Sequence, residues 1–154
     1  MRMRIGGLQK VTLLDYPGKV ACTVFLPGCN LRCPYCHNPA LVLPEQSNAP
    51  GIPESEVFAF LEQRKGKLDG ICITGGEPTL QPELPEFLEK ICDLGYAIKL
   101  DTNGTNPGML QGLLRDGILD QEQPSALCGN MWWRGHSFRG SGKRPSAAGQ
   151  SNRL

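Results

Sequence analysis

The sequence lacks long apolar runs, a strong net charge and an export signal. No apolar stretch approaches the roughly 20 residues that a membrane-spanning helix needs, so we expect no membrane association. The formal net charge is +1, which gives no reason to expect nucleic acid as a partner. A charged N-terminus followed by an apolar segment is also missing. These absences predict a soluble, cytoplasmic protein, and 154 residues without an internal repeat suit one modest domain.

Cysteine, in contrast, is frequent and unevenly placed. The chain has seven cysteines, an odd number that argues against a disulfide framework and for a reducing compartment. Three of them follow the spacing C-x3-C-x2-C: Cys29, Cys33 and Cys36. An apolar, β-branched run over 20–26 precedes them, and Pro27-Gly28 interrupts it. The spacing therefore predicts a cysteine-bearing loop at the carboxyl end of a strand.

Several interpretations of this loop remain open from spacing alone. Free cysteines are often buried as small hydrophobic residues, although three on one Pro/Gly-bounded loop fit that poorly. Zinc is a second possibility, with His37 as its fourth ligand, because structural zinc sites close all four positions. An iron–sulfur cluster is the third, since three thiolates leave one iron open to a substrate.

The residues around the loop also carry a family resemblance. With Tyr35 just before the last cysteine, the pattern resembles the signature of the radical SAM superfamily. The flanking residues 15–39 resemble the branch that activates glycyl radical enzymes, above all the proteins that activate anaerobic ribonucleoside-triphosphate reductase. The resemblance runs from about residue 3 to about residue 120.

This resemblance implies cofactors, a reaction and partners. Cys29, Cys33 and Cys36 would ligate three irons of a 4Fe–4S cluster, whose fourth iron binds S-adenosylmethionine, and Tyr35 would belong to the cofactor site. Flavodoxin or ferredoxin would supply one electron, which cleaves S-adenosylmethionine to methionine and a 5′-deoxyadenosyl radical. That radical would take hydrogen from a glycine of anaerobic ribonucleotide reductase.

Two further segments match the family at later strand ends. Gly75, Gly76 and Glu77 follow a short apolar run, and on their own they predict a turn. The resemblance implies that they hold the amino group of S-adenosylmethionine. Asp101 opens an Asp-Thr-Asn-Gly turn after the next expected strand. The resemblance places Asp101 beside the same cofactor, where it would help to hold a monovalent cation.

Periodicity and turn signals predict alternating strands and helices. A turn at 15–18 should join the first strand to the next as a hairpin. The expected strands are 5–14, 20–26, 71–74 and 96–100, and the expected helices are 54–65, 84–94 and 106–116, with one helical turn near 40–43. This order predicts an α/β fold with a parallel sheet. The resemblance implies a partial (β/α) barrel, truncated here to about three β/α units plus the N-terminal hairpin.

We expect a core domain over 1–120 and an irregular, disordered tail over 121–154. A fourth parallel strand should open at 118–120 and not continue, because periodicity is then lost. Our hypothesis is that out-of-frame sequence replaces the second half of the barrel; another reading frame beyond codon 120 should then restore the periodicity. Three alternative functions stay open: a radical SAM enzyme acting on a small molecule, a non-enzymatic zinc-binding module, and an inactive truncated fragment.

Overall fold

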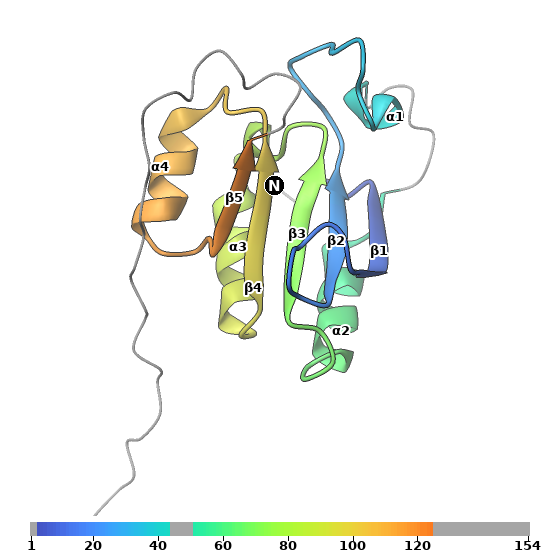
Figure 1. The fold of residues 1–154 in the computed structure, drawn as a ribbon, viewed down its shortest axis with the longest axis vertical. Helices are drawn as coiled ribbons and strands as arrows, with labels where there is room; N and C mark the ends of the chain where they lie inside the picture. The colour runs from blue at the N-terminus through green and yellow to red at the C-terminus, as the bar shows by residue number, and fades with distance from the viewer. Residues whose placement is uncertain (1–2, 44–50, 125–154) are drawn as a thin grey trace, which may run out of the picture.

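The computed structural model describes residues 3–43 and 51–124. Its strands and helices alternate along the chain (Figure 1). The strands are β1 Gly7–Thr12, β2 Ala21–Leu26, β3 Gly70–Gly75, β4 Ala97–Thr102 and β5 Gln121–Pro124. The helices are α1 Pro39–Val42, α2 Glu54–Gln63, α3 Leu84–Asp93 and α4 Pro107–Arg115, with a 3-10 turn η2 at Pro78–Leu80.

The five strands form one sheet in the order β1-β2-β3-β4-β5. β1 pairs antiparallel with β2, from Gly7 opposite Phe25 to Thr12 opposite Ala21. The predicted hairpin is thus confirmed, and its turn is closed by the N–H of Lys19, which donates to the carbonyl of Tyr16 over 3.1 Å. The remaining neighbours are parallel. The predicted α/β class is confirmed, as are the three β/α units and the N-terminal hairpin.

One face of the sheet carries the apolar core. Val24, Ile73 and Leu100 lie side by side across β2, β3 and β4, and none of the three is exposed. They pack in one cluster with side chains of α2 and α3, which lie behind the sheet in Figure 1. Burying each such side chain contributes about 1.5–3 kcal/mol. The core therefore fixes the positions at which these strands end.

The opposite face carries a row of polar side chains. Thr23, Cys72 and Lys99 occupy matching positions on β2, β3 and β4, and all three are buried. We call these three residues the polar row. They face away from the core cluster because successive residues of a strand point to opposite faces.

The predicted position of the next strand is wrong by three residues. The strand expected to open at Ile118 lies at Gln121–Pro124 and pairs parallel with β4, so the sheet has four parallel strands. The segment expected to be irregular from residue 121 thus begins as a strand. Asp120 explains the shift, because its N–H donates to Ile98 O and its carboxylate accepts from Ile98 N. Residues 121–124, Gln-Glu-Gln-Pro, show no alternation of apolar and polar side chains, so the sequence pattern did not predict this strand. The rest of the expected tail, 125–154, lies outside the described residues.

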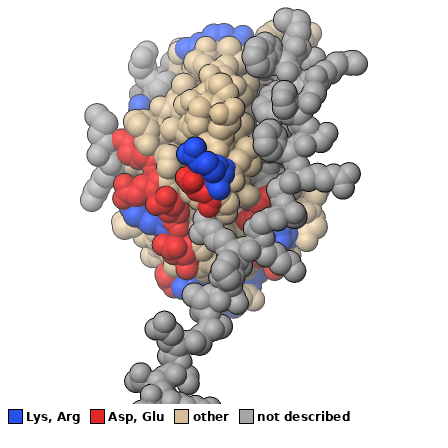
Figure 2. Space-filling model, turned by 90° about the vertical axis from the view of Figure 1, so that its left-hand side faces the viewer, with Lys and Arg blue, Asp and Glu red and all other residues tan. Residues whose placement is uncertain are grey.

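Charged side chains gather unevenly on the side of the molecule that α4 occupies. Figure 2 faces that side and shows acidic side chains concentrated at its left, beside a broad surface that carries little charge. On α3, Lys90 pairs with Glu86 over 2.9 Å and with Glu54 of α2 over 3.2 Å.

Within residues 3–43 and 51–124, no helix is long and apolar enough to cross a membrane.

Candidate functional site

Three strand ends meet at one edge of the sheet. The parallel strands β2, β3 and β4 all point to the upper edge in Figure 1, so the segments that follow them lie together. These segments are the cysteine loop, residues 27–38, then the GGE segment, residues 75–77, then residues 103–106. The three segments that carry the predicted site residues thus lie at the same edge of the sheet (Figure 1). α1 supports the cysteine loop, since Gly28 N donates to Leu41 O over 2.7 Å.

The GGE segment is fastened to the base of the cysteine loop. Gly76 N donates to Leu26 O over 2.8 Å, and Glu77 N donates to Gly28 O over 2.7 Å. A side-chain carbon on Gly75 would overlap the backbone of Leu26, and one on Gly76 would overlap Gly28. Gly75 also has φ +124°, a conformation that glycine tolerates. Both glycines therefore allow the backbone of the cysteine loop to lie directly against the end of β3.

Glu77 joins the ends of β3 and β4. Its side chain is 1% exposed, and its Oε1 accepts hydrogen bonds from Thr79 N, Thr79 Oγ1 and Thr102 Oγ1. Its Oε2 accepts from the backbone N–H of Asn103. The predicted contact of Glu77 with the amino group of S-adenosylmethionine stays a prediction, and Oε2 is the carboxylate atom with fewer donors from the chain.

Asn103 lies where the three segments meet, and sequence reasoning missed it. Its side-chain nitrogen donates to Asn30 Oδ1 over 2.9 Å and lies 3.8 Å from Cys29 Sγ, within reach of an N–H···S bond. Its Oδ1 accepts from Thr105 N and Oγ1. The sequence signal was the Asp-Thr-Asn-Gly turn, which predicts local bonds such as those to Thr105 but no contact 74 residues away.

The cysteines themselves are half-buried on the loop. Cys29 Sγ accepts a hydrogen bond from Leu31 N over 3.4 Å, and Cys36 N donates to Cys33 O. Tyr35 is 77% exposed, and His37, two residues later, is also exposed. In the described part of the chain, no three His, Cys, Asp or Glu side chains are gathered closely enough to hold a metal ion.

The donor set nevertheless fits an iron–sulfur cluster. Three thiols on one loop match cysteine ligation, and the N–H groups near Cys29 suit a thiolate that carries negative charge. Cys29 and Cys36 form no disulfide. Binding a cluster requires the loop to draw the three thiols together. Zinc bound by the same thiols and His37 would require the same movement.

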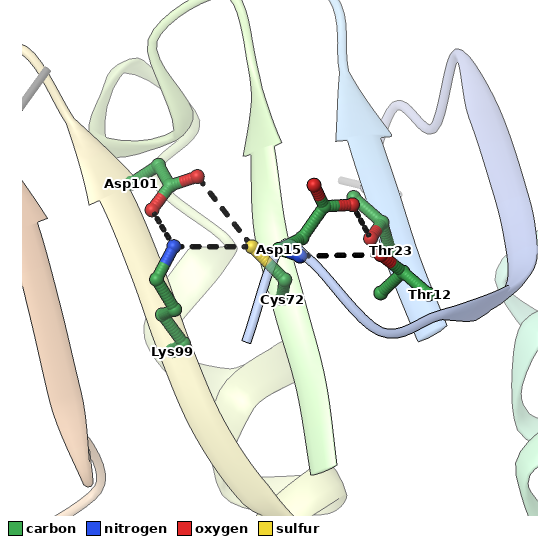
Figure 3. Close-up of polar contacts among 6 residues, drawn as sticks. All are labelled: Thr12, Asp15, Thr23, Cys72, Lys99 and Asp101. Carbon is green, nitrogen blue, oxygen red and sulfur yellow. Dashed lines mark hydrogen bonds and ion pairs between the residues drawn. The ribbon is translucent and has the colours of Figure 1, made fainter. Parts of the chain in front are cut away.

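Asp101 lies against the polar row, with 28% of its side chain still exposed (Figure 3). Its Oδ1 accepts from Lys99 Nζ over 2.5 Å, and its Oδ2 accepts from Cys72 Sγ over 3.5 Å. The Lys99 side chain is 3% exposed, so its ammonium is buried in an ion pair with the Asp101 carboxylate. The sequence signal for this pair was Lys99 within an apolar strand, two residues before Asp101 and so on the same face. The monovalent cation expected at Asp101 stays a prediction.

Two buried cysteine thiols of the sheet have raised pKa values. Burial, followed by the Asp101 carboxylate, raises the pKa of the Cys72 thiol to about 12. Burial alone raises the pKa of Cys22, on the core face of β2, to about 12. Both thiols are therefore neutral near pH 7, as expected of structural cysteines.

The turn before β2 is held over the same face as the polar row. Thr23 Oγ1 donates to Asp15 Oδ2 over 2.6 Å, and Asp15 N donates to Thr12 Oγ1 over 3.2 Å (Figure 3). Burial, followed by the Asp120 carboxylate, raises the pKa of Tyr16 to about 12. These contacts give the turn a structural role in closing the hairpin.

Comparison with known proteins places this arrangement in a family. A protein of Methanocaldococcus jannaschii named as a glycyl-radical enzyme activating enzyme is 35% identical over 129 residues, covering 83% of this chain and 52% of the relative. The pyruvate formate-lyase-activating enzyme of Clostridium pasteurianum is 32% identical over 117 residues, with 73% and 48% covered. The chain thus spans about half the length of these relatives.

A shorter sequence match and a structural match support the fold. The 7-carboxy-7-deazaguanine synthase of Aquifex aeolicus is 39% identical over 80 residues, covering 52% of this chain and 34% of the relative. The crystal structure of QueE from Escherichia coli superposes with a TM-score of 0.53 at 21% identity, covering 68% of this chain and 54% of QueE. The model of the Radical SAM superfamily matches residues 23–121, which contain the cysteine loop, the GGE segment and Asp101. The chain therefore belongs to the radical SAM superfamily.

Proposed function

We propose that the chain is a radical SAM activase that generates a glycyl radical on a partner enzyme, with anaerobic ribonucleotide reductase as the target. The observation that carries the proposal is the fastening of the cysteine loop to the GGE segment, through the bonds from Gly76 and Glu77 to Leu26 and Gly28. The names of the two relatives that align over most of this chain support the activase branch.

The residues divide between holding a cluster and holding S-adenosylmethionine. Cys29, Cys33 and Cys36 are the proposed ligands of a 4Fe–4S cluster. When bound, such a cluster supplies the low-potential electron that cleaves S-adenosylmethionine reductively. Tyr35, Gly75, Gly76, Glu77 and Asp101 are the proposed residues around S-adenosylmethionine.

The chain's own part in the reaction is positioning. Carbonyl and carboxylate acceptors at the end of β3 suit a cationic amino group, and the parallel strands hold them beside the cysteine loop. The buried Glu77 carboxylate fixes the separation of two strand ends, because it accepts from Thr102 and Asn103 of the neighbouring segment. Flavodoxin or ferredoxin is the proposed electron donor.

A second candidate is a radical SAM enzyme that acts on a small molecule. Its specific support is the 39% identity to a 7-carboxy-7-deazaguanine synthase, higher than the identity to either activase but over a shorter segment. Because this segment covers about a third of that relative, it supports a shared cofactor site better than a shared substrate.

Product analysis separates these functions. The anaerobically reconstituted chain, with dithionite and S-adenosylmethionine, should release methionine and 5′-deoxyadenosine. Addition of anaerobic ribonucleotide reductase should then give the EPR doublet of a glycyl radical. Cys36→Ala should abolish cleavage, while Cys92→Ala, on α3 and away from the loop, should not.

Each negative result points to a different conclusion. Cleavage without a glycyl radical on the reductase, but with conversion of 7-carboxy-7-deazaguanine precursors, would favour the second candidate. A chain that copurifies with zinc and cleaves no S-adenosylmethionine would overturn both candidates.

A further inference from the structure

We propose that Asn103 is a positioning residue for the cysteine loop, whose amide N–H bonds to Cys29 Sγ and thereby sets the reduction potential of a bound cluster. This inference rests on the proposed function and deepens it. The contact that carries it joins the segment after β4 to a cysteine 74 residues earlier in the chain.

A closed ring of hydrogen bonds holds Asn103 in place. Asn103 Nδ2 donates to Asn30 Oδ1 over 2.9 Å, and Asn30 Nδ2 donates to Thr105 Oγ1 over 2.9 Å. Thr105 Oγ1 in turn donates to Asn103 Oδ1 over 2.7 Å. Each of the three side chains thus donates once and accepts once within the ring. One member, Asn30, belongs to the cysteine loop, so the ring fixes that loop to the end of β4.

The ring also determines which end of the Asn103 amide faces the sulfur. Its oxygen accepts from both the N–H and the hydroxyl of Thr105, so its nitrogen must point the other way. The nitrogen carries two hydrogens, of which Asn30 takes one. The second remains for Cys29 Sγ at 3.8 Å. The donor is therefore aimed at the sulfur before a cluster is bound.

The backbone of Asn103 is anchored as well. Its N–H donates to Oε2 of Glu77, which is buried at the end of β3. Leu31 N supplies another donor to the same sulfur over 3.4 Å. Cys29 is thus a thiol with two N–H donors that come from different parts of the chain.

The expected consequence is a change in redox properties. An N–H···S bond stabilises a thiolate most when the cluster holds its extra electron, so it raises the reduction potential. Loss of the Asn103 donor should therefore shift the potential to more negative values. Loss of a contact around a metal site typically weakens metal binding by about 10-fold or more.

The test is a redox titration followed by EPR of the reduced cluster, without S-adenosylmethionine. Asn103→Ala removes the donor, and Asn103→Asp removes it while keeping the acceptor for Thr105. Both variants should form a cluster with a more negative potential than the wild type. The Asp variant should shift further because it places a negative charge beside the sulfur.

Asn106→Ala is the matched control. Asn106 lies on the same segment and caps α4, accepting from Met109 N and donating to Thr79 O, with neither contact on the cysteine loop. This variant should loosen the segment but keep the wild-type potential. Equal potentials in the wild type and both Asn103 variants would overturn the inference, as would the same shift in Asn106→Ala.

The wild-type chain separates this inference from the proposed function. If its cluster responds to S-adenosylmethionine while the Asn103 variants keep the wild-type potential, the inference alone fails. If the wild type takes up no cluster, both fail.

Discussion

The backbone N–H of Glu77 donates a 2.7 Å hydrogen bond to the carbonyl oxygen of Gly28. This bond joins the end of β3 to the residue just before Cys29, so the proposed cofactor-binding strand end and the cysteine loop form one structural unit. The unit depends on backbone atoms lying close together, which explains why a glycine pair stands at its centre.

Substitution of Gly76 by alanine should therefore be severely destabilising. The added carbon would overlap the carbonyl of Gly28, and neither backbone can move without breaking the bonds to Leu26 and Glu77. We expect Gly76→Ala to lower the free energy of unfolding by about 3 kcal/mol or more, measured by urea denaturation. The control is Gly112→Ala in α4, where the new carbon meets nothing within 4 Å and should stabilise the helix by about 0.5–1 kcal/mol. Similar stability in both variants would contradict this packing.

Replacement of the Glu77 carboxylate by an amide should separate the strand ends. Glutamine must turn its NH2 group toward one of the donors on Thr79, Thr102 or Asn103, which leaves that donor unsatisfied in a buried site. We expect Glu77→Gln to cost about 1–3 kcal/mol of stability in the same denaturation assay. Glu89→Gln, at an exposed position of α3, should stay within about 0.5 kcal/mol of the wild type. If the two variants were equally stable, the four-donor arrangement around Glu77 would be wrong.

Much of the fold was predictable because local signals agreed with one another. The hairpin turn at 15–18 and the Asn106 cap of α4 rest on residues next to each other in the sequence. The site was predictable as three segments at strand ends. β5 was placed wrongly because its pairing depends on Asp120 and on backbone bonds to β4.

The contacts among the three segments were not predictable from the sequence. The sequence predicted that Glu77 contacts S-adenosylmethionine. It did not predict that the Glu77 carboxylate accepts hydrogen bonds from four donors of the chain. Asn103 and Lys99 were not singled out, because their partners Cys29 and Cys72 lie in other segments. Single-sequence patterns identify a residue's type and its element but do not identify a partner far along the chain.

The cysteines should differ in reactivity toward an alkylating reagent. The pKa of Cys22 and of Cys72 is raised to about 12 by burial, so about one molecule in ten thousand carries either thiolate at pH 8. We expect iodoacetamide at pH 8 to modify the half-buried Cys29 and Cys36 before either buried thiol, as read by peptide mass mapping. The rate of Cys72 modification should rise about tenfold with each pH unit and level off only near pH 12. Early labelling of Cys72 in the folded protein would show that the polar row is open to solvent.

Lys99 and the monovalent cation expected at Asp101 are alternative partners of one carboxylate, and the salt dependence of S-adenosylmethionine binding decides between them. The Lys99 ammonium lies 2.5 Å from Asp101 Oδ1, so if Lys99 is the partner, wild-type affinity for S-adenosylmethionine should be the same in potassium chloride and in tetramethylammonium chloride. Lys99→Met removes this charge, and its affinity should then fall by about 5-fold or more when potassium is withdrawn. Lys90→Met, which removes an exposed lysine from α3, should behave as the wild type. A wild-type protein that itself requires potassium would contradict this role of Lys99.

We propose that the cysteine loop and the end of β3 together form a cluster site that S-adenosylmethionine can reach. The most direct measurement is EPR of the reduced chain after anaerobic reconstitution with iron and sulfide, recorded with and without S-adenosylmethionine. We expect a 4Fe–4S signal that changes when S-adenosylmethionine is added. A chain that binds zinc and forms no cluster, or a cluster whose signal does not respond to S-adenosylmethionine, would contradict it.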